Sequence, residues 1–228
     1  MKIGILKTGH APDIVLGELG DYDAMFARLL EGHGFEFEPY DVVDEDFPDG
    51  PNAADGWLIT GSRHGVYEDH PWLPPLEQLI RDIRDAGLPL VGVCFGHQVI
   101  AQALGGKVVK HPDGWRVGAT RYEIDGRPYM LNAWHQDQVI AVPAGAEVAG
   151  RAEGCDVAAL RYGDRIFSVQ PHPEFDATMM DRLIEHRAVG VVPDPLRDHA
   201  RALLDTPTDS AAMAGTIAAF FKKGASHG

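Results

Sequence analysis

The stretch that decides the fold runs from residue 88 to residue 106 and reads Leu-Pro-Leu-Val-Gly-Val-Cys-Phe-Gly-His-Gln-Val-Ile-Ala-Gln-Ala-Leu-Gly-Gly. Its first six residues form a short apolar run, which predicts a buried strand of a parallel sheet. A helical pattern of apolar residues follows at once, and Gly105-Gly106 marks its end. A strand, a sharp turn and a helix in this order indicate an α/β fold.

Cys94 lies at the turn between this strand and this helix, with Gly92 and Gly96 two residues away on either side. Gly-x-Cys-x-Gly is the spacing of a nucleophile elbow with cysteine in place of serine. We expect the small neighbours to let a substrate approach, and the helix N-terminus to favour a thiolate. A free cysteine is more often a small buried hydrophobe, but such a residue needs no glycine on both sides. The spacing therefore predicts a nucleophile.

A candidate base lies in Gln170-Pro-His-Pro-Glu174, directly after a predicted strand. Residues two apart in an extended chain project to the same side, and the two prolines favour an extended backbone. We expect Glu174 to hydrogen-bond one imidazole nitrogen of His172 and to leave the other nitrogen for a thiol. An isolated His-x-Glu would more often be a solvated surface pair. Combined with Cys94, it predicts a Cys–His–Glu triad.

Attack of a thiolate on a carbonyl produces an oxyanion, which requires hydrogen-bond donors. The Phe95 N–H, at the start of the helix after Cys94, is one candidate. The second is the turn Gly61-Ser62 after another predicted strand, since an oxyanion hole takes one N–H from a neighbouring loop. For Gly61 and Ser62 an ordinary strand-ending turn is the alternative interpretation.

Together these blocks resemble the motifs of class I (triad-type) glutamine amidotransferases. Gly92-Val-Cys-Phe-Gly-His-Gln98 resembles the nucleophile motif, Gln170-Pro-His-Pro-Glu174 the distal His-Pro-Glu motif, and Ile59-Thr-Gly-Ser62 the oxyanion loop. Their order and spacing match over roughly residues 50–175. The chain is most similar to stand-alone domains like the glutaminase half of GMP synthetase, and to gamma-glutamyl peptidases.

The resemblance implies that Cys94 attacks the γ-carboxamide of glutamine, or a similar γ-glutamyl amide, and forms a thioester. His172 would protonate the departing ammonia or amine and then activate water, while Glu174 orients His172. The chemistry needs no metal and no other cofactor.

The resemblance also implies three substrate contacts. Gln98 matches a position that helps to hold the amino-acid end of the substrate. His135 and Gln136 lie in Trp134-His-Gln-Asp137, which resembles the His-Gly-Asp-like segment of the same pocket. For these two, a polar turn between strands is the alternative. His97 is beside the nucleophile but is not expected to be catalytic.

Two departures from the family pattern concern the substrate and the partner. The chain has neither a Ser-Gly-Gly-x-Asp-Ser loop nor a P-loop, so it carries no ATP-using synthetase domain. Ammonia could therefore pass to a separate synthetase subunit. Position 171 is proline where many relatives carry an aromatic residue. The segment at residues 176–207 is longer than a minimal glutaminase domain needs. This segment could cap the pocket or meet a partner.

Strands and helices alternate through the first half of the chain. We expect strands at residues 2–7, 35–43, 56–60 and 88–93, with a loop at 8–20 and helices at 21–30, 71–86 and after Cys94. In the second half we expect strands at 107–110, 116–124, 147–150, 157–162 and 165–170, helices at 176–189 and 211–222, and an irregular segment at 193–207. This order predicts an open, mostly parallel, flavodoxin-like central sheet with helices on both faces and a small antiparallel extension. Without a linker or repeat, residues 1–228 are expected to form one domain.

Composition excludes several classes of function. The net charge of −14 argues against a nucleic-acid-binding or anionic-membrane surface. Two cysteines, Cys94 and Cys155, suggest neither a disulfide framework nor a zinc site and fit a reducing cytosol. The first residues contain no long apolar run, so we expect no signal peptide, and no apolar run approaches membrane-spanning length. We expect a cytoplasmic protein that acts on a small molecule.

Three functional hypotheses remain. The first is a glutamine amidotransferase-type glutaminase; the second is a gamma-glutamyl peptidase that uses the same triad on a larger amide. A non-catalytic binding or regulatory protein is the third, which the intact Cys94, His172 and Glu174 disfavour. A metal hydrolase is also disfavoured, because the eleven histidines form no His-x-x-x-His pair.

Overall fold

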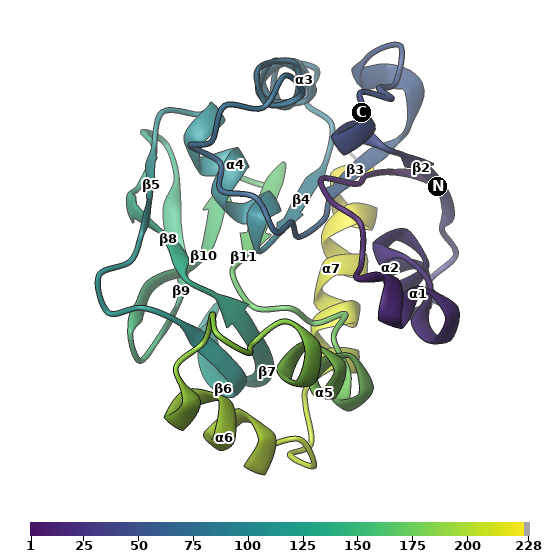
Figure 1. Cartoon of the computed structure of the whole chain (residues 1–228). Coiled ribbons are helices and arrows are strands. Elements are labelled where there is room, and N and C mark those ends of the chain that lie inside the picture. Colours follow the sequence, from purple (N-terminus) through teal and green to yellow (C-terminus); the bar gives the residue numbers. More distant parts are fainter. Residues whose placement is uncertain (226–228) are drawn as a thin grey trace.

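A nine-stranded sheet forms the centre of the molecule in the computed structural model, which describes residues 1–225 (Figure 1). Its parallel half has the order β2 (Glu36–Tyr40), β1 (Lys2–Leu6), β3 (Gly56–Ile59), β4 (Leu90–Val93) and β11 (Ile166–Val169). Short runs of mostly apolar residues make β1, β3, β4 and β11, whereas β2 alternates with glutamates at the edge of the sheet; β3, β4 and β11 are buried along their whole length. Such strands are typical of a parallel sheet covered on both faces.

The same sheet continues into an antiparallel half. Its strands are β10 (Cys155–Tyr162), β9 (Glu147–Ala152), β6 (Arg116–Ile124) and β7 (Arg127–His135). The turn between β6 and β7 is Asp125-Gly126, both with positive φ (50° and 71°), as a two-residue hairpin turn requires. A separate two-stranded sheet pairs β5 (Lys107–Lys110) with β8 (Asp137–Ala141). The expected fold class is confirmed.

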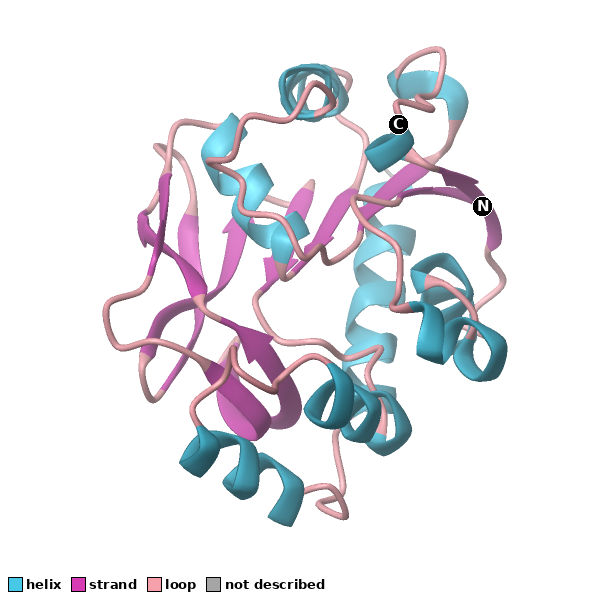
Figure 2. Ribbon diagram, viewed as in Figure 1, coloured by secondary structure: helices cyan, strands magenta, loops and turns pink. Residues whose placement is uncertain are grey.

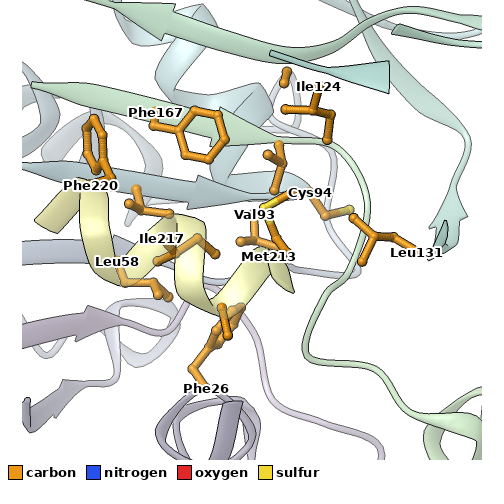
Figure 3. Close-up of a cluster of buried hydrophobic side chains, with 14 of the residues drawn as sticks. Phe26, Leu58, Val93, Cys94, Ile124, Leu131, Phe167, Met213, Ile217 and Phe220 are labelled. Atoms are coloured by element: carbon orange, nitrogen blue, oxygen red, sulfur yellow. The ribbon is translucent and has the colours of Figure 1, made fainter. Parts of the chain in front are cut away.

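Helices cover both faces of the parallel half (Figure 2). On one face lie α2 (Tyr22–Leu29) and α7 (Ser210–Ala225), whose Met213, Ile217 and Phe220 face the strands (Figure 3). On the other lie α3 (Leu73–Asp85) and α4 (Phe95–Ala103). The apolar stripe of α3 is buried as its helical spacing predicts.

Three further helices are α1 (Asp13–Leu19), α5 (Ala177–His186) and α6 (Asp194–Ala202); α5 contacts both α1 and α6, and α6 packs on β6. A third apolar cluster joins α1, α2 and α5 through Val15, Met25 and Met179. No helix among residues 1–225 is long and apolar enough to cross a membrane.

Four elements differ from the expectations. α1 occupies the expected loop, because Pro12 precedes its first turn and Gly17 is tolerated inside it. α6 occupies the expected irregular segment, because its prolines stand at its start, where no N–H is needed. β7 and β8 were not predicted. β7 buries residues on both faces, so its sequence does not alternate.

Candidate active site

Three neighbouring parallel strands converge on one site. β3, β4 and β11 pair in register, with Gly92 of β4 level with Ile59 on one side and Ser168 on the other. Their carboxyl ends are therefore adjacent, and they lead directly into Gly61, Cys94 and the residue-170 loop. This edge is the usual ligand site of an open α/β sheet.

Cys94 has a strained backbone. Its φ of 53° and ψ of −103° lie outside the regions that non-glycine residues normally adopt. The Cys94 N–H donates to the Val169 carbonyl at 2.9 Å, which fixes the turn to β11. The side chain is 5% exposed, and its thiol lies at the start of α4.

The structure corrects the reason for the two flanking glycines. A Cβ on Gly92 would come within 2.6 Å of the Gly96 carbonyl, and a Cβ on Gly96 would overlap the Ile59 carbonyl oxygen. The Gly96 N–H donates to the Thr60 carbonyl at 3.1 Å. The glycines therefore face the protein, not a substrate, and they let α4 pack against the end of β3.

His172 and Glu174 form a buried pair. The imidazole Nδ1 lies 2.6 Å from Glu174 Oε1, and the two side chains are 3% and 0% exposed. A carboxylate accepts, so Nδ1 carries a proton and Nε2 is left for Cys94. Burial alone would lower the pKa of His172, but the charges of Cys94 and Glu174, with the hydrogen bond to Glu174, raise it to about 10. The charged imidazolium is thus favoured beside the sulfur.

We expected an extended backbone between these two residues, but the structure has a turn there. Residues 173–174 form a turn, closed by the Phe175 N–H donating to the His172 carbonyl at 3.4 Å. The ring of Phe175 stacks on the imidazole with centroids 4.0 Å apart and planes at 5°. Asn132 of β7 fastens both ends, accepting from the His172 N–H at 2.9 Å and donating to the Phe175 carbonyl at 2.9 Å. The predicted pairing is present, but a turn produces it.

The candidate oxyanion donors lie beside this pair. A Cβ on Gly61 would lie 2.9 Å from His172 Cε1 and 3.8 Å from Cys94 Cβ, so the Gly61 backbone borders both residues. Phe95 is the first residue of α4, and its N–H has no acceptor within the helix. The Ser62 hydroxyl donates to the Thr8 carbonyl at 2.6 Å. Its side chain therefore holds the loop, and only its backbone is available to a substrate.

Two glutamines form a chain of hydrogen bonds that ends at the sulfur. The Gln98 amide nitrogen donates to the Asp137 carbonyl at 2.9 Å and to Gln170 Oε1 at 3.2 Å. The Gln170 amide nitrogen in turn donates to Cys94 Sγ at 3.6 Å. Both hydrogens of the Gln98 amide are thus used within the protein, and only its carbonyl oxygen is left for a ligand.

The predicted pocket segment reaches the same place. The Trp134 carbonyl lies 4.0 Å from Cys94 Sγ. His135 is 4% exposed, with Nδ1 3.3 Å from the Asp137 carbonyl and a buried Nε2 that has no partner in the described chain. Burial, with the charge of His172, lowers the pKa of His135 to about 3, so it is neutral. Gln136 is half-buried at the turn between β7 and β8, and its carbonyl accepts from the His111 N–H.

His97 and Cys155 lie outside this constellation. His97 is fully buried, with Nε2 3.1 Å from the Val157 carbonyl and Nδ1 2.8 Å from the Ser168 hydroxyl. Burial lowers the pKa of His97 to about 4, so it is a neutral structural residue. Cys155 is a buried free thiol whose pKa burial raises to about 12.

Sequence analysis missed three residues of the site. Gln170 was in the quoted motif and directly precedes the first proline, but nothing in the sequence indicates that its amide reaches the sulfur. Asn132 lies on a strand that was not predicted. Phe175 follows the motif, and its own stacking partner, Tyr22 of α2, is 6.2 Å away and distant in sequence.

Comparisons with known proteins agree on one family. The family model "Glutamine amidotransferase class-I" matches residues 30–189. A glutamine amidotransferase-like protein of Schizosaccharomyces pombe is 29% identical over 96% of this chain and 97% of its own. Gamma-glutamyl peptidase 4 of Arabidopsis thaliana is 27% identical over 75% of this chain and 74% of its own. GMP synthase of Clostridium novyi is 32% identical over 70% of this chain, which is 32% of that enzyme.

Solved structures show the same fold. A glutamine amidotransferase from Methylobacillus flagellatus superposes with a TM-score of 0.78 at 24% identity, over 98% of this chain and 94% of that one. One from Thermotoga maritima has a TM-score of 0.78 at 20% identity, over 99% and 98%.

Proposed function

Because this chain belongs to the class I glutamine amidotransferase family, we propose that it is a cysteine-dependent amidohydrolase that cleaves the γ-carboxamide of glutamine. The observation that carries the proposal is the strained Cys94 turn beside the buried His172–Glu174 pair. Structures that align with 98% of the chain support a further proposal, that residues 1–228 form a single domain of this family.

In the proposed first half-reaction, the Cys94 thiolate attacks the amide carbon. The oxyanion accepts hydrogen bonds from the Phe95 and Gly61 N–H groups, with the Ser62 N–H as the adjacent donor. The carbon–nitrogen bond then breaks, the nitrogen takes the proton from His172 Nε2, and ammonia leaves an acyl-thioester on Cys94. The raised pKa of His172 supports this step, because the imidazole begins it protonated.

In the second half-reaction, the now neutral His172 takes a proton from water, and the resulting hydroxide attacks the thioester carbon. The thiolate of Cys94 leaves, and glutamate is released. Glu174 holds the Nδ1 proton throughout, so that Nε2 always faces the sulfur. Gln170 is proposed to donate to the thiolate each time it forms.

We propose that Gln98, His135 and Gln136 hold the substrate. Gln98 would offer its carbonyl oxygen to the α-amino group, since both its amide hydrogens are used. His135 would offer its partnerless Nε2. The half-buried Gln136 would line the rim of the site.

A gamma-glutamyl peptidase is the second candidate, and the share of this chain that such relatives match supports it. Gamma-glutamyl peptidase 5 of Arabidopsis thaliana matches over 91% of this chain, whereas the GMP synthase of Clostridium novyi matches over 70% of it. The chemistry is the same, but the leaving group is an amine. In the glutaminase alternative, a separate synthetase subunit would receive the ammonia.

The test compares glutamine, glutathione and γ-glutamyl dipeptides as substrates, measuring ammonia and released amine. Cys94→Ala should lower turnover of the best substrate by at least ~10⁴-fold, since it removes the nucleophile. Cys155→Ala is the matched control and should keep activity, because Cys155 lies in the core. A glutamine-like electrophile should label Cys94 in the wild type. Full activity of Cys94→Ala would refute the proposal.

A further inference from the structure

A second cluster of reactive side chains lies in the loop between β3 and α3, outside the proposed triad. His64, Glu68 and His70 each turn one ligand-type atom toward the others. His64 Nδ1 lies 3.3 Å from Glu68 Oε2, and His70 Nε2 lies 2.7 Å from the same oxygen. The three side chains are 18%, 44% and 27% exposed, so the cluster is open to solvent on one side.

From this geometry we propose that His64, Glu68 and His70 form a binding site for a divalent zinc ion. Two imidazole nitrogens and a carboxylate are a known zinc donor set, with a fourth position left for water. Bonds of about 2.0–2.1 Å in a tetrahedron place neighbouring ligand atoms about 3.3 Å apart. The His64–Glu68 distance already has this value, the His70–Glu68 distance of 2.7 Å must lengthen to it, and all three ligand atoms lie within 4.8 Å of one another. The site goes beyond the proposed hydrolysis, which uses none of these residues.

Neighbouring contacts hold the two imidazoles in place. The His70 ring stacks on Trp72, with centroids 5.5 Å apart and planes at 13°. The His64 ring lies edge-on to Trp72 with centroids 5.8 Å apart, and the His64 backbone N–H donates to the Ser62 hydroxyl at 3.1 Å. A preformed donor set loses less entropy when the ion binds.

The same contacts connect this site to the active site. Trp72 packs on Phe95, 5.7 Å away, and the Ser62 hydroxyl holds the loop that begins with Gly61. Zinc would tie residue 64 to residue 70 and so brace the loop that carries one candidate oxyanion donor. The alternative is a plain pair of hydrogen bonds from two imidazole N–H groups to Glu68.

The test is a titration of tag-free, metal-stripped protein with zinc chloride, monitored by calorimetry, in a Cys94→Ala background that removes the active-site thiol as a competitor. We expect one zinc ion per chain. His70→Gln and Glu68→Gln should each weaken binding by at least ~100-fold, more than the loss of an outer-shell partner costs. His186→Gln is the matched control, because His186 is an exposed histidine beside a single carboxylate; it should bind zinc as its parent does.

Cobalt chloride gives an independent reading of the same site. We expect the intense visible absorption of a tetrahedral cobalt ion, lost in His70→Gln and kept in His186→Gln. Melting curves of all variants without metal show whether each is folded. Equal zinc affinity in all four proteins, or no stoichiometric binding to the folded parent, would overturn the proposal. Since the background is inactive by design, neither result depends on the proposed hydrolysis.

Discussion

Some backbone atoms at the active site lie so close to neighbouring side chains that a Cβ added to them would clash. Gly61 illustrates this, because its missing side chain is the space that the His172 imidazole occupies. The Phe175 ring stacks on the imidazole, and Glu174 accepts a hydrogen bond from its Nδ1. A ring held by these contacts cannot move away from a new neighbour without losing one of them.

Gly61→Ala therefore tests the position of the imidazole. The added Cβ would lie 2.9 Å from His172 Cε1, which forces the ring away from the sulfur. We expect kcat to fall by ~10²-fold or more, since a misplacement of about 1 Å at a reacting group has this effect. Steady-state kinetics with the preferred substrate measure it. Gly17→Ala, where nothing lies within 4 Å, is the control and should leave kcat unchanged; an unimpaired Gly61→Ala enzyme would show that the imidazole is free to move.

At the scale of elements, the elbow depends on how closely α4 approaches β3. A parallel strand and the helix that follows it normally leave room for side chains between them. Here the backbone of Gly96 touches the end of β3 directly and hydrogen-bonds to Thr60. This contact stabilises the strained φ of Cys94.

Gly96→Ala should for this reason destabilise the fold. Its Cβ would overlap the Ile59 carbonyl oxygen, which cannot move without breaking the sheet. We expect the free energy of unfolding to fall by about 1–3 kcal/mol or more, as in other overpacked sites. Gly215→Ala in α7, with nothing within 4 Å, should instead raise it by about 0.5–1 kcal/mol. Urea denaturation compares the two; a neutral Gly96→Ala would contradict the close packing described above.

A charged contact joins three elements near the same edge. His10 follows β1, and its Nδ1 and Nε2 lie 2.8 Å from Asp21 and 2.9 Å from Asp44. Asp21 caps α2, and Asp44 ends the turn after β2. The hydrogen bonds to Asp21 and then Asp44 raise the pKa of His10 above its ordinary value of 6.5.

The direction of this shift predicts how stability depends on pH. A pKa raised by folding gives stability that is complete below the unfolded value and is lost as pH rises through the folded value. His10→Gln should therefore lower Tm at about pH 5.5 and have little effect at about pH 9. His10 is partly exposed, and screening by water limits such contacts to about 1 kcal/mol, so the shift should not exceed about 2–4 °C. A larger loss at the alkaline pH would show the opposite sign.

For the whole molecule, the sheet separates two large apolar clusters. One contains Ile217 of α7, and the other contains Ile80 of α3; both residues are fully buried. Strands β3 and β4 lie between them, so the two clusters share backbone but not side-chain contacts. Stability should therefore be divided between the two faces.

This division is tested with Ile217→Val and Ile80→Val, alone and together. Each should reduce the free energy of unfolding by about 0.5–1.5 kcal/mol, because each leaves a cavity the size of one methyl group. The double variant should equal their sum within about 0.3–0.5 kcal/mol, as for sites without shared partners. Chemical denaturation provides all three values. A clear departure from the sum would show that the sheet transmits strain from one face to the other.

Local patterns in the sequence are enough to predict the strands of the parallel half and the three stretches at their carboxyl ends. Its short apolar runs, glycine spacing and helical periodicity are local properties, and they predict β3, β4, α3 and α4 without knowledge of the rest. The pairing of Glu174 with His172 was predictable because only one residue separates them.

The surroundings of that pair depend instead on contacts between distant parts of the chain. The Asn132 clamp, the Gln98–Gln170 chain to the sulfur and the stacking of Phe175 join residues up to 76 positions apart. The turn at 173–174, and not an extended chain, brings the carboxylate to the imidazole because Asn132 holds both of its ends. Such contacts depend on which strands become neighbours. Strand β7, which pairs with β6 but was not predicted, shows that local periodicity does not contain this information.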